Sequence, residues 1–200
     1  MTKNQTVTAQ TKQNLIQAFW ELYSIKRIDK ITIKEITMRA GYNRSTFYEY
    51  FSDVYDVLEK IENNLISKLQ ELPIKQLSSP DDPFPFEVLI STYSSHSKYL
   101  IVLLGDQGDP AFQGRIKASI KPMIKETLVA QGAKDDFELE YTLEYALSAT
   151  IGILSYWFSQ EKAPSIEKLV ELLTDLSDEG IMKKLIGAGN VTLLDNTSLF

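Results

Sequence analysis

Apolar residues recur along most of this chain at every third or fourth position, which is the period of an amphipathic α-helix. No run alternates as a half-buried strand does, and no segment repeats, so the pattern predicts an all-α protein. A first helix is expected over about residues 8–24, where Leu15, Phe19 and Leu22 share one face.

Two short helices are expected next, joined by a tight turn. Thr32 and Glu35 have the spacing of a capping box, which begins one helix, and Gly41 ends it. Asn43 can cap a very short third helix that runs to about Tyr50, because its side chain can accept the free N–H groups of the first turn.

A fourth, long helix is expected to begin after Ser52 and Asp53, and a loop rich in Pro and Ser follows it. Pro122 is expected to end or kink one of the later elements, so that another helix continues to about residue 131. The tail, residues 187–200, has weak helical character. Later helices are expected over about residues 84–104, from 110 to Pro122, from there to about 131, and over 136–160 and 166–176.

The amino-acid composition argues against several kinds of functional site. The chain has no cysteine and one histidine, His96, so disulfides, thiolate metal sites and a histidine relay are not expected. We find no Gly-rich phosphate loop and no clustered metal ligands, so we expect no cofactor and no enzyme activity. The polar start and the lack of a long apolar run predict a cytoplasmic protein.

Charge is distributed unevenly along the chain. Residues 1–60 hold nine Lys and Arg against seven Asp and Glu, although the whole chain has a formal charge of -6. Because electrostatic recognition belongs to one face rather than to the average, the N-terminal part alone remains a candidate for binding nucleic acid.

The two short helices over residues 32–50 have the layout of a helix-turn-helix unit, whose second helix enters the DNA major groove. The alternative is an ordinary helical hairpin. A purely structural helix of this length should consist mostly of core residues, and Phe47 and Phe51 are enough to anchor it. Its other side chains are of the types that meet phosphates and base edges, which favours DNA binding. These residues are Asn43, Arg44, Ser45, Thr46, Tyr48 and Tyr50.

Residues 33–51, IKEITMRAGYNRSTFYEYF, followed by DVYDVL, resemble the N-terminal signature of the tetracycline-repressor (TetR) family. Residues 103–112, LLGDQGDPAF, resemble the body of a subgroup common in Gram-positive bacteria. The resemblance implies a dimeric bacterial transcription regulator without enzyme activity. It divides the chain into a DNA-binding head over 1–55, a regulatory and dimerisation body over 56–186, and the tail.

The resemblance also implies roles for individual residues. Arg44, Ser45 and Thr46 match positions that face bases or nearby phosphates, and Tyr48 and Tyr50 match phosphate-contacting positions. Thr32 would present a helix N-terminus to a phosphate. The family often has a small Val where this chain has Tyr42, which either adds a contact or covers the turn. The implied DNA-binding set is Thr32, Tyr42, Asn43, Arg44, Ser45, Thr46, Tyr48 and Tyr50.

The helix expected over residues 136–160 is rich in apolar and small residues. It can be a plain core helix, but the resemblance implies that it and the last helix pair with their copies in a four-helix dimer interface. The expected interface residues are Ser148, Ala149, Gly152, Ser155, Leu169, Leu172, Leu173 and Leu176.

Aromatic residues of the middle region are candidates for the lining of a ligand cavity, although such residues are more often plain core. The candidates are Phe84, Phe86, Tyr93, His96, Tyr99, Phe112 and Trp157. The resulting hypothesis is a homodimeric repressor that a small-molecule inducer releases from a palindromic operator in double-stranded DNA. The alternative is a coactivator that acts through a protein partner.

Overall fold

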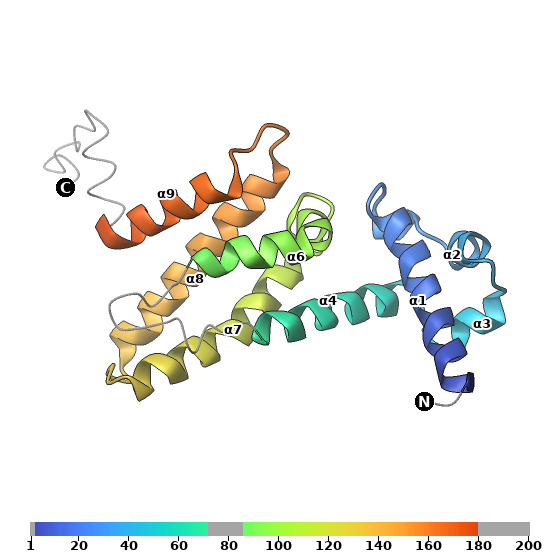
Figure 1. The fold of residues 1–200 in the computed structure, drawn as a ribbon, viewed down its shortest axis with the longest axis horizontal. Coiled ribbons are helices and arrows are strands. Elements are labelled where there is room, and N and C mark those ends of the chain that lie inside the picture. Colours follow the sequence, from blue (N-terminus) through green and yellow to red (C-terminus); the bar gives the residue numbers. More distant parts are fainter. Residues whose placement is uncertain (1–2, 72–85, 180–200) are drawn as a thin grey trace, which may run out of the picture.

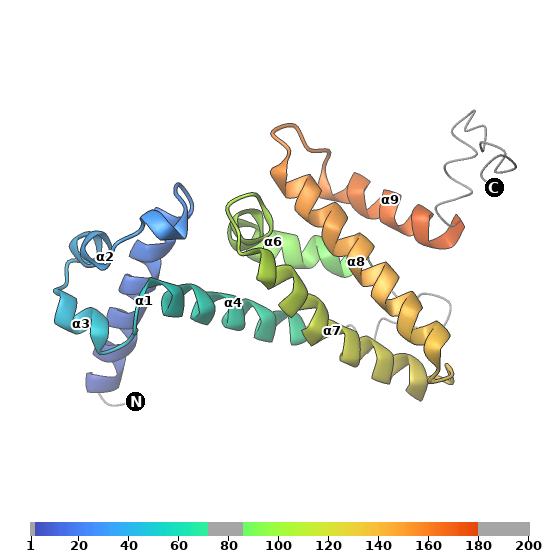
Figure 2. The ribbon, with the colours of Figure 1, turned by 180° about the vertical axis from the view of Figure 1, so that it is seen from behind.

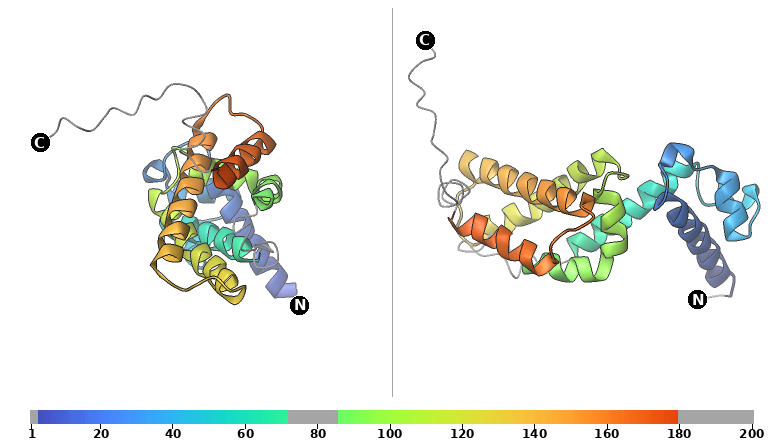
Figure 3. Two further views of the ribbon diagram at one scale, coloured as in Figure 1. Left: turned by 90° about the vertical axis from the view of Figure 1, so that its left-hand side faces the viewer. Right: turned by 90° about the horizontal axis from the view of Figure 1, so that it is seen from above.

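The computed structural model describes residues 3–71 and 86–179, and within these ranges every regular element is helical, as predicted. Figures 1 and 3 show an elongated molecule with a head at one end and a helical body at the other. The elements are α1 (Lys3–Tyr23), the 3₁₀ turn η1 (Ile28–Lys30), α2 (Ile33–Ala40), α3 (Arg44–Tyr48), α4 (Val54–Gln70), α6 (Glu87–Leu104), α7 (Pro110–Ala130), α8 (Phe137–Ser159) and α9 (Ile166–Glu179).

Local signals set the boundaries of the short helices in the head. The predicted capping box is present, with the Thr32 hydroxyl accepting from the Glu35 N–H at 3.3 Å and a Glu35 carboxylate oxygen accepting from the Thr32 N–H at 3.0 Å. Gly41 ends α2 with φ of +76°, a left-handed conformation that glycine adopts without strain. These interactions join residues three apart or closer, so the sequence alone predicts them.

One apolar core runs from the head into the near half of the body. It contains Phe19, Phe47, Val57 and Leu103, none of which is more than 1% exposed. A second core, around Leu143, lies between the body helices. Because the first core crosses the predicted boundary between residues 55 and 56, α4 packs with both the head and the body, as the views from the front and from behind show (Figures 1 and 2).

Of the two alternatives expected at Pro122, a helix end or a kink, the helix end is wrong, because α7 is a single helix from Pro110 to Ala130 with Pro122 inside it. Proline lacks an N–H, so the carbonyl of Ala118 loses its helical partner. Both residues are exposed, so water can take over that hydrogen bond.

The predicted loop after α4 and the tail over residues 187–200 lie outside the described residues. In residues 3–71 and 86–179, no helix combines the length and the apolar character needed to cross a membrane.

Candidate functional site

The helix formed by α3 is anchored on one side and open on the other. Phe47 and Phe51 are buried, with ring centroids 5.4 Å apart, and they attach the helix to the core of the head. Arg44, Ser45 and Tyr48 are exposed, and the Tyr48 ring is 59% exposed. The apolar face of α3 is therefore buried, and its opposite face exposes hydrogen-bonding groups, which is the arrangement of a recognition helix.

The Asn43 side chain organises the start of this exposed face. Its Oδ1 accepts three hydrogen bonds, from the Thr46 N–H at 2.8 Å, the Ser45 hydroxyl at 2.6 Å and the Thr46 hydroxyl at 3.0 Å. The predicted cap is thus present, and it also fixes two of the predicted DNA-contacting side chains.

Tyr42 covers the turn between α2 and α3. Its hydroxyl accepts a hydrogen bond from Asn14 of α1 at 3.0 Å, and its half-buried ring packs on the core. Tyr42, at the position where a small Val is common in the family that the sequence resembles, therefore has a structural role: it ties the turn to the first helix. Tyr50 is half-buried, and its carbonyl accepts from the Lys60 ammonium at 3.3 Å.

Several charged side chains of the head form ion pairs with one another, and these pairs do not involve α3. Lys26 pairs with Glu35 at 2.7 Å and Arg39 pairs with Glu21 at 2.9 Å. The hydrogen bond from Lys26 is the main reason why the pKa of Glu35 is lowered to about 2. Arg44, in contrast, is exposed and forms no ion pair with any described residue, so it is available to an anionic partner.

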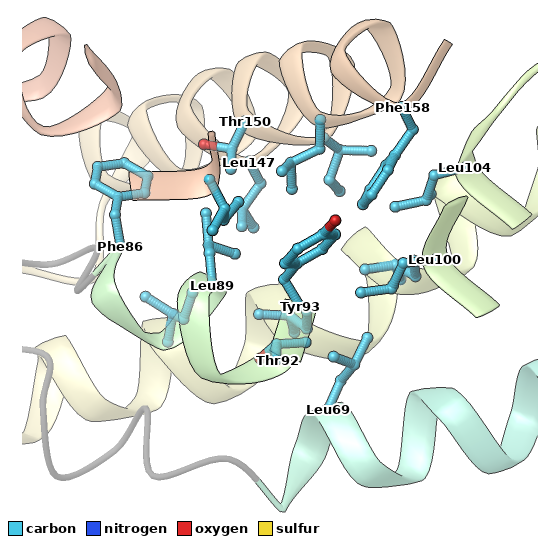
Figure 4. Close-up of a pocket in the computed structure, with 16 residues that line it drawn as sticks. Leu69, Phe86, Leu89, Thr92, Tyr93, Leu100, Leu104, Leu147, Thr150 and Phe158 are labelled. Atoms are coloured by element: carbon cyan, nitrogen blue, oxygen red, sulfur yellow. The ribbon is translucent and has the colours of Figure 1, made fainter. Parts of the chain in front are cut away.

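The body contains an apolar cavity of about 140 Å³. Side chains from α4, α6, α7 and α8 and the first residue of α9 line it, and their polar groups are the hydroxyls of Thr92, Tyr93 and Thr150. Figure 4 shows the Tyr93 ring at the centre of this lining. An apolar cavity with a few polar groups is the usual form of a small-molecule site.

Two of the seven predicted ligand residues, Phe86 and Tyr93, line this cavity. Trp157 packs edge-on against Tyr93, with centroids 5.2 Å apart, but its Nε1–H donates to the Pro164 carbonyl at 2.8 Å and it does not line the cavity. Phe84 lies outside the described residues.

The remaining three predicted residues do not line this cavity. His96 and Tyr99 line a different groove, between α1, α4 and α6. Phe112 is fully buried in the first core. The sequence also missed the aliphatic part of the lining, such as Ile120 and Leu147, because these residues follow the same helical period as ordinary core positions.

The outer face of α8 carries exposed aromatic residues that do not belong to the predicted interface set. Phe137 and Tyr141 are both 73% exposed, Tyr145 is 57% exposed and Tyr156 is 68% exposed. They follow one face at helical spacing, and two predicted interface residues, Ser148 and Gly152, are exposed on the same helix, with Ala149 half-buried beside them. Such an exposed apolar face typically marks an interaction surface.

Three predicted interface residues face inward instead. Leu169 and Leu173 are each 4% exposed because they cover the second core of their own chain. The half-buried Ser155 hydroxyl donates to the Leu104 carbonyl at 2.6 Å. On α9 the more accessible members of the predicted set are Leu172, which is exposed, and Leu176, which is half-buried. Among the described residues, no group of three or more His, Asp or Glu could hold a metal ion.

Comparisons with known proteins place these features in one family. Residues 81–179 match the family model TetR_C_8, described as a transcriptional regulator C-terminal region. No curated protein matches the sequence.

The fold is similar to that of a TetR transcriptional regulator from Streptococcus agalactiae 2603V, with a TM-score of 0.63 and 20% identity over 86% of this chain and 96% of that one. It is also similar to the dihydroxyacetone kinase operon activator DhaS, with a TM-score of 0.59 and 17% identity over 83% of this chain and 93% of that one. Residues 81–179 therefore belong to the TetR_C_8 family of transcriptional regulator C-terminal regions, and the head and body together have the fold of a solved TetR transcriptional regulator.

Proposed function

We propose that this regulator is a homodimeric, sequence-specific repressor that inserts α3 into the DNA major groove and is released by a small apolar molecule. The observation that carries the proposal is the open face of α3, with an unpaired Arg44 and an exposed Tyr48 on a helix fixed by Phe47 and Phe51. Arginine can read guanine through a bidentate contact, whereas tyrosine donates to phosphate oxygens.

Dimerisation is supported by the aromatic face of α8. Tyr141, Tyr145 and Tyr156 present more exposed apolar surface than a helix in water usually carries, and Gly152 between them allows close approach of a second helix. A two-fold dimer presents two α3 helices, so the operator should be a palindrome with half-sites roughly 34–36 Å apart or a multiple of that.

The cavity supports a ligand of defined character. Its lining is almost wholly apolar, which excludes charged molecules because no described side chain there could pair with them. Its volume of about 140 Å³ is close to that of an apolar protein cavity known to hold benzene, roughly 150 Å³. Such a ligand can release DNA only if it binds the released arrangement more tightly than the DNA-bound one.

Selection from a random double-stranded DNA library tests the DNA-binding part, with the native chain compared to Arg44→Ala and Tyr48→Ala. We expect a palindrome from the native chain, relaxed choice at particular positions from Arg44→Ala, and weaker binding to all sequences from Tyr48→Ala. Arg27→Ala is the matched control, because Arg27 is an exposed arginine that lies outside the helix-turn-helix and pairs with Asp29.

Failure to enrich any motif at about 50 mM salt, where phosphate contacts are strong, would refute DNA binding. The acidic body would then be tested for a protein partner. Expression of a reporter placed downstream of a selected operator, measured with and without the chain, distinguishes repression from the activation named for the similar protein DhaS.

A further inference from the structure

A buried carboxylate lies where the head meets the body. Glu62 of α4 is 1% exposed and is the only charged side chain that is buried in the described part of the chain. It faces α7, from which an Arg115 guanidinium nitrogen donates to Glu62 Oε2. Burying a charge is costly unless pairing and hydrogen bonds compensate for it, so packing alone does not explain an acidic residue at this position.

The Glu62–Arg115 pair is incompletely satisfied. Glu62 Oε1 and Arg115 Nε are both buried without a hydrogen-bond partner. Asp109 places a second carboxylate 3.6 Å from the same guanidinium. Two carboxylates thus share one arginine, and a small movement of α4 relative to α7 can exchange one pairing for the other.

The same junction connects four parts of the molecule. The Tyr23 hydroxyl of α1 donates to the Gln107 carbonyl in the turn before α7 at 3.1 Å, and Asp109 caps α7 by accepting from the Ala111 N–H. Burial, together with the negative charges of Glu62 and Asp109, raises the pKa of Tyr23 to about 12. Glu62 therefore lies among contacts that join α1, α4, α7 and the turn.

The two helices that carry the pair also line the cavity. Arg115 directly precedes Ile116, which lines it from α7, and Leu69 lines it from α4 about two helical turns after Glu62 on the same apolar stripe. Figure 2 shows α4 running from the head to α7. A ligand that separates α4 from α7 at the cavity must therefore also change the contact between Glu62 and Arg115.

We propose that Glu62 and Arg115 are positioning residues that hold the head in one orientation relative to the body and transmit changes in the cavity to the head. The inference rests on the proposed function, because a change of head orientation matters only if the head binds DNA. Its test, however, needs neither an operator nor a dimer.

The experiment measures a distance between head and body within one chain. The chain has no native cysteine, so Met38→Cys in the head and Lys134→Cys in the body, both at exposed positions, place two spin labels. Labelled chains are diluted with unlabelled protein, so that two labelled chains rarely meet in one dimer. Double electron–electron resonance then measures only the distance between the two labels of one chain. We expect Glu62→Gln to shift the distance by more than the width of the native distribution. Glu71→Gln, at an exposed carboxylate directly after α4, should leave the distance unchanged.

Two further readouts separate positioning from packing. Burial raises the pKa of Glu62 to about 7, with Arg115 opposing this effect and Asp109 and Glu59 adding to it. The native distance should therefore change between about pH 6 and pH 8, and the distance in Glu62→Gln should not. In addition, Arg115→Gln and the double variant should both give the distance of Glu62→Gln, because the pair acts as a unit.

Benzene is the probe for transmission from the cavity, and it should shift the distance in the native chain but not in Glu62→Gln. A folded Glu62→Gln chain with the native distance at every pH would overturn the positioning role, and a benzene shift that persists in this variant would overturn transmission. A chain that shows these shifts but selects no DNA refutes the proposed function alone. A chain that selects an operator but shows no shift refutes the positioning pair alone.

Discussion

Replacing Glu62 with glutamine should remove a pH dependence of stability that the native chain carries. Burial raises the pKa of the Glu62 carboxyl from 4.5, the value for an exposed group, to about 7. Between these values the folded chain keeps a proton that the unfolded chain has released, so the free energy of unfolding falls as the pH rises. The stabilisation is fully present below pH 4.5 and is lost as the pH rises through about 7. The interval between the two pKa values corresponds to about 3 kcal/mol.

The other carboxyl groups with a large pKa shift do not change stability between pH 4.5 and about 7. Hydrogen bonds, principally from Lys26 to Glu35 and from Lys117 to Glu144, lower the pKa of each of these acids to about 2. Their stabilising contributions are present above the unfolded value of 4.5 and are lost only at lower pH. A change in stability between about pH 5 and pH 8 that depends on residue 62 therefore reports Glu62 itself.

The assay is urea unfolding at about pH 5 and pH 8, at one fixed protein concentration because dimerisation would couple to stability. The native chain should lose about 3 kcal/mol more than Glu62→Gln across this interval. Arg115 tolerates the loss of its partner, since its side chain is 40% exposed and Asp109 lies 3.6 Å away. Exposed Glu71→Gln, which does not contribute to the pKa shift of Glu62, is the matched control and should follow the native chain.

Parallel pH profiles for the native chain and Glu62→Gln would refute the reasoning, because the carboxyl would then titrate alike in the folded and unfolded states. An upward native profile, with stability rising from about pH 5 to pH 8 relative to the variant, would contradict its sign. Arg115 would in that case stabilise the ionised carboxylate more than burial destabilises it.

Two predictions concern the head and the outer face of α8. Asn43→Ala removes the acceptor of three hydrogen bonds and should lower the free energy of unfolding, measured in urea, by about 1 kcal/mol. Asn63→Ala, at an exposed position, is the control and should leave that free energy nearly unchanged. Equal losses of stability in the two variants would contradict the capping role of Asn43. Tyr145→Glu places a charge on the aromatic face of α8 and should produce monomers in sedimentation, whereas Tyr55→Glu, an equally exposed tyrosine near the head, should not; dimeric Tyr145→Glu would exclude this face as the interface.

The sequence predicts the head well because its determinants are local. The capping box, the glycine at the end of α2 and the Asn43 cap all act within three or four residues, and propensity and hydrogen-bond geometry determine them without any knowledge of tertiary structure. The same locality explains the error at Pro122, because whether a helix tolerates an internal proline depends on the exposure of the freed carbonyl.

The cavity and the interface faces could not be predicted in the same way. Hydrophobic period identifies an apolar stripe but does not say whether a neighbour in the same chain or a second copy covers it, and this is why Leu169 and Leu172, both on α9, were placed together. Glu62 does interrupt an apolar stripe, which is a readable signal. Its partner, however, lies 53 residues away, a pairing that no local rule predicts.

The orientation of the head depends on these directional contacts rather than on the amount of apolar surface. Apolar burial is non-directional, so the continuous core from head to body would tolerate a range of angles between α4 and α7. The exposed hydrogen bond from Gln70 of α4 to Ser119 of α7, at 2.7 Å, competes with water and restricts that angle weakly. Glu62 is buried, so little water reaches its carboxylate to compete with Arg115, and a change there should alter how the chain responds to a ligand while the fold remains the same.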